Sequence, residues 1–401
     1  MENREFITKS TMPRREVLKS LAGVAAVCAV PSSLSGVARG AEGPVTFSNS
    51  INPRWYGFDL LEYFSIDTDW MQHFPYRLGD FVEDDFRWMR DWGFNWARLP
   101  MDYRLWTDAT DLMKIREKDI EPIDRAVKLG EKYGVHINIC LCRAPGEWIL
   151  DEMALESKIR QDPEKTSVYT SQATFDAFVH QWDFFAGRYK GIPGKRLSFN
   201  LVNEPLERDK ENETGRKDYA RLARTSIEAI KSHDPQRIIV SDGYPVGGDP
   251  VAELYDTGVT QSCHDYRPAE VCNFRLPWSR PWSDALPVPT WPLKDKDAKI
   301  AADKQSMREG LAPWKEPARH GIPIHFGEMG CGVQVPPQVV YAWFNDTLDL
   351  IGELNSGWAL WNFRGPCGIL DSRREGTKYT SWRGHALDVT LLRLLQSKMK
   401  T

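Results

Sequence analysis

The 401-residue sequence lacks long apolar runs and lacks a strong excess of charge of either sign. Beyond the first 41 residues, no segment has the roughly 18 to 20 consecutive apolar side chains that a membrane-spanning helix needs, so we expect no integral membrane segment. The 52 lysine and arginine residues are balanced by 56 aspartate and glutamate residues. Domains that bind nucleic acid normally carry a basic excess, so the sequence argues against a nucleic-acid partner.

Cysteine is scarce and dispersed. The seven cysteines do not cluster as they do in small secreted domains that depend on disulfides. The pair Cys140-x-Cys142 would suggest a metal site, but no second pair of Cys or His with zinc spacing accompanies it. We therefore predict neither a metal nor a cofactor.

Residues 1–41 have the pattern of a removable export signal. Arg14-Arg15 precedes the apolar run Leu21–Val30, and Ala38-Arg39-Gly40 is a small-x-small cleavage site. The run has 10 residues, too few to cross a bilayer, and the order of basic, apolar and small segments is that of a signal peptide. The paired arginines predict the twin-arginine (Tat) route. A surface helix that contains Arg-Arg is the alternative.

If the signal is removed, residues 42–401 form the mature protein. No linker of low complexity divides this part of the sequence. We expect one domain, a monomer, in the periplasm or outside the cell.

Tryptophan is abundant, since 16 tryptophans exceed 13 tyrosines. Hydrophobic cores do not require this excess, whereas clefts that bind sugars use flat aromatic rings to stack on the apolar faces of pyranoses. The composition favours a protein that binds carbohydrate.

Short β-rich runs alternate with longer amphipathic stretches. This alternation predicts parallel βα units, and eight such units close into a single (β/α)8 TIM barrel, an α/β fold. An open doubly wound sheet is the alternative, but no Gly-x-Gly-x-x-Gly turn follows the first strands. The predicted strands are Trp55–Phe58, Trp96–Leu99, His136–Leu141, Leu197–Val202, Arg237–Val240, Val259–Cys263, Ile324–Gly327 and Trp358–Trp361. The predicted helices are Asp84–Trp92, Ile120–Tyr133, Phe175–Tyr189 and Tyr219–Ser232.

The segment Arg267–Asp297 is predicted to be a loop insertion. It follows the sixth strand, so it begins on the face of the barrel that carries catalytic groups. It contains Trp278, Trp282, Trp291 and six prolines. Because loops are mostly exposed, we expect at least one of the three rings to line a substrate cleft. Packing of the rings against barrel helices is the alternative.

Two glutamates stand at the ends of predicted strands. Glu204 directly follows the fourth strand, and Glu328 ends the seventh, so both are expected at the same mouth of the barrel. Each alone could be a helix cap or half of a salt bridge, because a buried carboxylate needs a partner. Together they match the pair that hydrolyses glycosides, in which a protonated carboxyl group donates to the leaving oxygen and an ionised one attacks the anomeric carbon.

Six motifs carry a resemblance to a known family. The chain resembles glycoside hydrolase family five, the cellulase family, within the clan of 4/7 barrel glycosidases, over residues 55 to 375. The motifs occur in the family's order and are Gly93-Phe94-Asn95-Trp96-Ala97-Arg98-Leu99-Pro100, Arg143-Ala144-Pro145-Gly146, Asn203-Glu204-Pro205, His264-Asp265-Tyr266, Gly327-Glu328-Met329-Gly330 and Gly357-Trp358-Ala359-Leu360-Trp361-Asn362.

The resemblance implies roles for the two glutamates and their neighbours. Glu204 resembles the general acid/base, and Glu328 resembles the nucleophile. Asn203 matches the residue that binds the sugar 2-hydroxyl. Arg98 matches the arginine that keeps the nucleophile ionised, although a structural salt bridge is the alternative.

Three aromatic residues complete the implied site. Tyr266 matches a tyrosine that is hydrogen-bonded to the nucleophile, and His264 matches a histidine near the acid/base. Trp361 matches the platform under the sugar at the cleaved bond. His264 and Trp361 could instead be ordinary core residues.

One residue departs from the family's pattern. Members usually have a histidine before the turn that follows the third strand, where this chain has Cys142. A thiol is a weaker and shorter donor than imidazole, so Cys142 is expected to alter substrate contacts or lower the rate. Both carboxylates remain.

The resemblance therefore implies a retaining, endo-acting β-glycoside hydrolase that acts on a β-linked polysaccharide or oligosaccharide. A weakly active or non-hydrolytic carbohydrate-binding barrel, which Cys142 favours, is the alternative, as are a related β-mannanase and an exo-β-glucosidase. A metal-dependent barrel hydrolase would need clustered His and Asp at strand ends, which the sequence lacks. Glucan, mannan, xyloglucan and glycolipid substrates share this constellation in the family.

Overall fold

The computed structural model describes residues 54–64, 80–108, 111–147, 167–206, 213–276 and 279–399. The predicted export signal, residues 1–41, lies outside the described residues, and so does Trp278. Among the residues that the structure describes, no helix is both long and apolar enough to cross a membrane.

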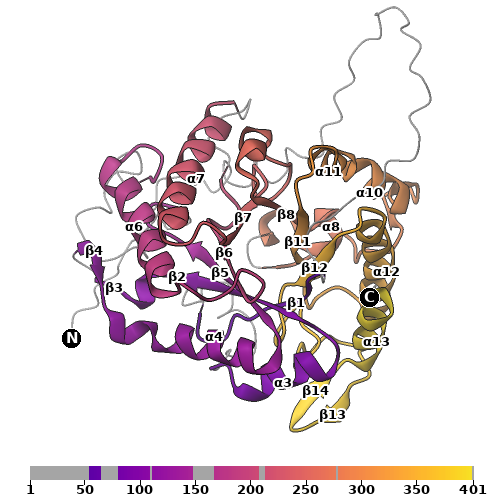
Figure 1. The fold of residues 1–401 in the computed structure, drawn as a ribbon. Helices are drawn as coiled ribbons and strands as arrows, with labels where there is room; N and C mark the ends of the chain where they lie inside the picture. Colours follow the sequence, from indigo (N-terminus) through magenta and orange to yellow (C-terminus); the bar gives the residue numbers. More distant parts are fainter. Residues whose placement is uncertain are drawn as a thin grey trace, which may run out of the picture. The chain divides into compact units, whose positions relative to one another are not determined.

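Eight parallel strands form a closed barrel, which confirms the predicted (β/α)8 fold and excludes the open sheet (Figure 1). The order around the barrel is β1-β12-β11-β8-β7-β6-β5-β2. Each barrel strand therefore lies beside the next barrel strand in the sequence, and the last, β12, pairs with the first, β1. The barrel strands are β1 (Tyr56–Asp59), β2 (Trp96–Asp102), β5 (His136–Arg143), β6 (Leu197–Asn200), β7 (Ile238–Asp242), β8 (Thr260–Asp265), β11 (Ile324–Met329) and β12 (Gly357–Leu360).

Helices follow the strands and cover the barrel. The four predicted helices are confirmed with ends shifted by a few residues, and α6 begins further upstream because the Ser171 hydroxyl caps it by accepting from the Thr174 amide. Helix α4 ends where Gly134 adopts a left-handed φ of 69°. The helices are α3 (Glu83–Asp91), α4 (Glu121–Tyr133), α6 (Gln172–Arg188), α7 (Glu213–His233), α8 (Ala269–Cys272), α9 (Arg280–Ser283), α10 (Lys304–Gly310), α11 (Lys315–Arg319), α12 (Pro337–Glu353) and α13 (Val389–Lys398).

The predicted insertion contains short elements. Helices α8 and α9 follow β8, and β9 (Leu293–Lys294) then pairs with β10 (Ile300–Ala302) in an antiparallel hairpin. Two further hairpins lie outside the barrel, β3 (Thr107–Asp108) with β4 (Asp111–Ile115) and β13 (Thr380–Trp382) with β14 (His385–Leu387).

The amino end of the barrel is filled by side chains. Trp55, Trp96, Val240 and Ala359 form a buried cluster there, and the ring of His325 packs with its centroid 4.7 Å from that of Trp96. Burial lowers the pKa of His325 to about 3, and the positive charges of His136 and Arg98 add to this effect. The side chains of this cluster are therefore part of the barrel core.

Close backbone packing between β1 and β2 generates a prediction. A Cβ atom on Gly57 would lie 1.8 Å from the Trp96 carbonyl oxygen, a contact that only backbone movement can relieve. We expect Gly57→Ala to lower the free energy of unfolding by about 3 kcal/mol, measured by chemical denaturation. The control is Gly187→Ala in α6, where the added methyl group has ordinary contacts and helix propensity favours alanine. Equal stability of the two variants would contradict this account of the barrel packing.

Candidate active site

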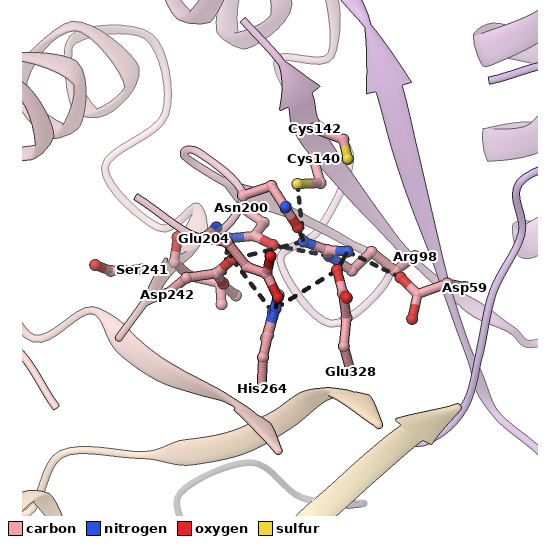
Figure 2. Close-up of polar contacts among 12 residues, drawn as sticks. Asp59, Arg98, Cys140, Cys142, Asn200, Glu204, Ser241, Asp242, His264 and Glu328 are labelled. Carbon is pink, nitrogen blue, oxygen red and sulfur yellow. Dashed lines mark hydrogen bonds and ion pairs between the residues drawn. The ribbon is translucent and has the colours of Figure 1, made fainter. Parts of the chain in front are cut away.

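The carboxyl ends of the strands bring the predicted polar residues together. Glu204 follows β6, Glu328 lies near the end of β11, and His264 and Tyr266 stand at the end of β8. One oxygen of each glutamate and a ring nitrogen of His264 all lie within 4.8 Å of one another. Figure 2 shows the side chains of Glu204, His264 and Glu328 pointing toward one another. Sequence positions far apart thus converge on one small polar site.

Local backbone geometry aims the two glutamates. Glu204 has a left-handed φ of 43°, and its amide donates to Asp242 Oδ2 at 3.0 Å. In β11, the pairing with β8 shifts by one residue between Phe326 and Glu328, so that Glu328 lies opposite His264. The intervening residue must be small, because a Cβ on Gly327 would lie 2.5 Å from Ser262 Oγ.

Arg98 is the buried centre of the site. Its side chain is 1% exposed, and Nη1 donates to Glu328 Oε1 at 2.5 Å and to Asp59 Oδ1 at 2.9 Å. Nη2 donates to Asn203 Oδ1 at 2.7 Å, and Nε donates to Asn200 Oδ1 at 2.9 Å. Burial opposes the charge, but the surrounding anionic groups outweigh it and raise the pKa of Arg98 well above its ordinary value. A permanent positive charge therefore lies against Glu328.

The second contact of Glu328 is with Tyr266. The phenol Oη donates to Oε2 at 2.9 Å, while Arg98 holds the other oxygen. Burial raises the pKa of Tyr266 well above its ordinary value, and the Glu328 charge adds to this effect, so the phenol remains a donor. Both oxygens of Glu328 are therefore hydrogen-bonded, and this fixes the carboxyl group in position.

Glu204 has a different environment. Burial raises its pKa, and the nearby Glu328 charge raises it further, while the hydrogen bond from His264 works in the opposite direction. His264 Nδ1 lies 2.9 Å from Glu204 Oε1. The environment of Glu204 therefore favours its protonated form.

His264 is held between acidic groups. Its Nε2 lies 3.2 Å from Asp242 Oδ2, on the side of the ring opposite Glu204. Burial alone would lower the pKa of His264, but the charges of Asp242 and Glu328 outweigh burial and hold it well above the ordinary range. Burial likewise opposes the charge of Asp242, yet His264 and Arg98 bring the pKa of that carboxyl down to about 2. At neutral pH the pair is an imidazolium and a carboxylate.

Cys142 lies at the end of β5, buried and near the carboxylates (Figure 2). Burial raises the pKa of its thiol to about 12, and the Glu328 and Glu204 charges contribute. The thiol is therefore neutral, and a neutral thiol is a poor nucleophile. On the same strand, Cys140 Sγ accepts from Arg98 Nη2 at 3.1 Å.

The predicted tryptophans that the structure describes differ in exposure and in the residues that they contact. Trp361 follows β12, is partly exposed, and its amide donates to the Met329 carbonyl at 2.8 Å, beside Glu328. Trp282 in α9 is partly exposed. Trp291 instead packs against the main hydrophobic cluster, and its Nε1 donates to Asp346 Oδ2 of α12 at 3.0 Å. That contact accords with the packing alternative for Trp291.

Glu204, His264 and Glu328 are close enough to ligate a metal ion, and within the described ranges they are the one such group. The chemistry of the donor set disfavours this use. An imidazolium has no free lone pair, and His264 already lies between two carboxyl groups.

The sequence analysis missed three buried polar residues around Arg98. Asp59 ends β1, Asp242 ends β7, and Asn200 ends β6, where its Nδ2 donates to Asp242 Oδ1 at 2.9 Å. Each is a polar residue at the carboxyl end of a barrel strand, the same signal that identified Glu204 and Glu328. Applying that rule to the first and fifth strands as well would have found both aspartates.

Comparison with known proteins places the chain among carbohydrate-active enzymes. Residues 55–365 match the sequence profile described as "Cellulase (glycosyl hydrolase family 5)". "Endoglucanase C" of Acetivibrio thermocellus is 22% identical over 307 residues, which cover 71% of this chain and 84% of that protein. "Cellodextrinase A" of Ruminococcus flavefaciens is 24% identical over 283 residues, which cover 69% and 77% of the two chains.

The fold comparison agrees. A solved structure titled "Crystal Structure of a glycoside hydrolase" superposes with a TM-score of 0.74 at 33% identity, covering 86% of this chain and 99% of the other.

The contact between Asp242 and His264 generates a prediction for pH dependence. Asp242→Asn removes a charge that holds His264 protonated, so His264 becomes neutral in the working range. A neutral His264 no longer lowers the pKa of Glu204, and this effect exceeds the smaller one by which the Asp242 charge itself raises that pKa. We expect the pKa of Glu204 to rise and the alkaline limb of the pH profile of kcat/KM to move to higher pH. The control is Asp265→Asn, which removes a buried carboxylate paired with Arg267. An unmoved limb in Asp242→Asn would contradict the assignment.

Proposed function

This chain belongs to the cellulase family, glycoside hydrolase family 5, and from that premise we propose that it is a retaining, endo-acting β-glycoside hydrolase that cleaves a β-linked polysaccharide by double displacement. Its membership of the family and its likeness to endoglucanases support glycoside hydrolase activity of the cellulase type. The retaining mechanism and the endo mode are the finer parts of the proposal.

One observation carries the retaining mechanism. Oxygens of Glu204 and Glu328 lie within 4.8 Å of each other, and the two carboxyl groups have opposite environments. Retaining enzymes separate their carboxyl groups by about 5–5.5 Å, whereas inverting enzymes leave roughly 6.5–9.5 Å for a water molecule. The short separation favours direct attack by one carboxylate on the sugar.

In the first step, an oxygen of Glu328 attacks the anomeric carbon while the bond from that carbon to the glycosidic oxygen breaks. Glu204 gives its proton to the departing oxygen, so the leaving chain departs as a neutral alcohol. Arg98 and Tyr266 hold Glu328 in position for the attack. Asn203, fixed by Arg98 at 2.7 Å, is positioned to bind the sugar 2-hydroxyl.

In the second step, Glu204 acts as a base. It takes a proton from water as the water oxygen attacks the anomeric carbon, and the bond to Glu328 breaks. Two displacements at one carbon restore the β configuration. The His264 imidazolium helps Glu204 alternate between the two roles, because it stabilises the ionised form that exists between the steps.

The substrate class follows from the relatives and from the aromatic residues. The printed names "Endoglucanase C" and "Cellodextrinase A" support a β-glucan chain or its oligosaccharides as substrate. Trp361, beside Glu328, is proposed as the platform for the sugar at the cleaved bond. We further propose that the protein acts as a monomer after Tat-dependent export to the periplasm or the cell exterior, and that the polysaccharide is its partner there.

Substitution of the two glutamates tests the mechanism. We expect Glu204→Gln and Glu328→Gln each to lower kcat on a soluble β-glucan by several orders of magnitude, with the native fold retained by circular dichroism. On aryl glycosides with good leaving groups, which need little protonation, Glu204→Gln should lose much less activity than Glu328→Gln.

Reducing-sugar release and nitrophenol release measure these two activities. Equal losses by both variants on both substrates would contradict the roles. An inactive wild-type protein that still binds the glucan would favour the non-hydrolytic alternative that Cys142 raises.

A matched pair of tryptophans tests the insertion. We propose that Trp282 lines the substrate groove, whereas Trp291 is engaged with Asp346. Trp282→Ala should raise KM for a long oligosaccharide about tenfold and leave hydrolysis of a short aryl glycoside nearly unchanged. Trp291→Ala should lower the melting temperature without this selective effect. The reverse pattern would assign the groove to Trp291.

A further inference from the structure

Two buried cysteines lie in contact behind the active site. The Sγ atoms of Cys272 and Cys331 are 3.9 Å apart, and both side chains are at most 1% exposed. Among the cysteines that the structure describes, all of which are free thiols, this is the pair whose sulfurs touch.

A backbone hydrogen bond connects the two segments that carry the cysteines. The Gly332 amide donates to the Cys272 carbonyl at 2.9 Å, and Arg374 Nη2 donates to the Cys331 carbonyl at 3.0 Å. Disulfides require neighbouring backbones, because their Cα atoms lie only about 4.4–6.8 Å apart. The hydrogen bond across the pair supplies that proximity.

The two cysteines belong to the loops that carry the nucleophile and its tyrosine. Cys331 is three residues beyond Glu328, and Cys272 is six residues beyond Tyr266. Tyr266 donates to Glu328 at 2.9 Å, so a covalent link between these loops would hold that contact in place.

We propose that Cys272 and Cys331 are a disulfide site, which oxidation closes to tie the β8 insertion to the loop that follows β11. The proposal concerns stability and does not depend on the retaining mechanism. It matters for an exported protein, because oxidising compartments supply the necessary electron acceptors.

The oxidant is a low-molecular-weight disulfide such as oxidised glutathione. The Cys331 thiol loses its proton, attacks one sulfur of the oxidant and releases one glutathione thiol, leaving a mixed disulfide on the protein. The Cys272 sulfur then loses its proton and attacks Cys331 Sγ, which releases the second thiol. Two protein thiols become one disulfide, and one small disulfide becomes two thiols.

Burial slows this reaction in the folded protein. Burial raises the pKa of Cys272 well above its ordinary value, and the hydrogen bond from Cys331 raises it further, so little reactive thiolate is present. Oxidation should therefore need local opening, and the closed disulfide should be equally resistant to reduction.

The test equilibrates the full-length protein with a series of glutathione redox buffers for several days in 1 M urea, which promotes local opening. Alkylation and peptide mass spectrometry then identify which cysteines are linked. We expect a Cys272–Cys331 peptide to form first, and the oxidised protein to melt several degrees higher than the reduced protein. After a heat challenge, it should retain more folded protein by circular dichroism.

Variants distinguish the possible partners. Cys272→Ser and Cys331→Ser should each abolish the gain in melting temperature, whereas Cys367→Ser, a third buried cysteine in the same region, should keep it. A Cys331–Cys367 link would overturn the proposal. The proposal would also be overturned if Cys272 and Cys331 remained free thiols in the most oxidising buffer, whether or not other cysteines had become linked. Activity is not the readout, so failure here leaves the proposed hydrolysis untouched.

Discussion

The buried guanidinium of Arg98 is the charge on which the site depends. A cation with a side chain 1% exposed is stable only when anionic groups surround it, because desolvation of an unpaired charge costs several kcal/mol. Strand ends from around the barrel meet this demand, with Asp59 from β1 and Glu328 from β11 on the same nitrogen. The arginine thus holds the carboxyl group of Glu328, the proposed nucleophile, in position.

The balance of charge around Arg98 also explains the acid. Four carboxyl groups, Asp59, Glu204, Asp242 and Glu328, share the site with two cations, Arg98 and His264. Burial raises the pKa of both Asp59 and Glu204, whereas His264 and Arg98 hold Asp242 near 2. The excess of carboxyl groups over cations thereby favours a proton on Glu204, as the proposed role of general acid requires.

Much of this arrangement could be predicted from the sequence, because barrel strands are recognisable as short apolar runs and catalytic groups of barrel enzymes follow such runs. The eight strands and the convergence of Glu204 and Glu328 rest on that rule. The electrostatic roles of Asp59 and Asp242 could not be predicted in this way, because they depend on the cations beside each carboxylate, which only the folded structure shows. Nor does the sequence show that Trp291 reaches Asp346 while Trp282 stays partly exposed, because loop side chains are placed by tertiary contacts. The family motifs predicted the residues proposed to bind substrate, and the structure added Asp59 and Asp242, which lie beside Arg98.

The central claim is that Glu328 attacks the sugar directly and that Glu204 serves both displacements. Proton NMR of the first product formed from a soluble β-linked oligosaccharide tests it, because the anomeric signal reports the configuration before mutarotation. The account predicts that the β-anomer appears first and that the α-anomer grows in only at the rate of spontaneous mutarotation. Initial release of the α-anomer would show a single displacement by water and would contradict the account.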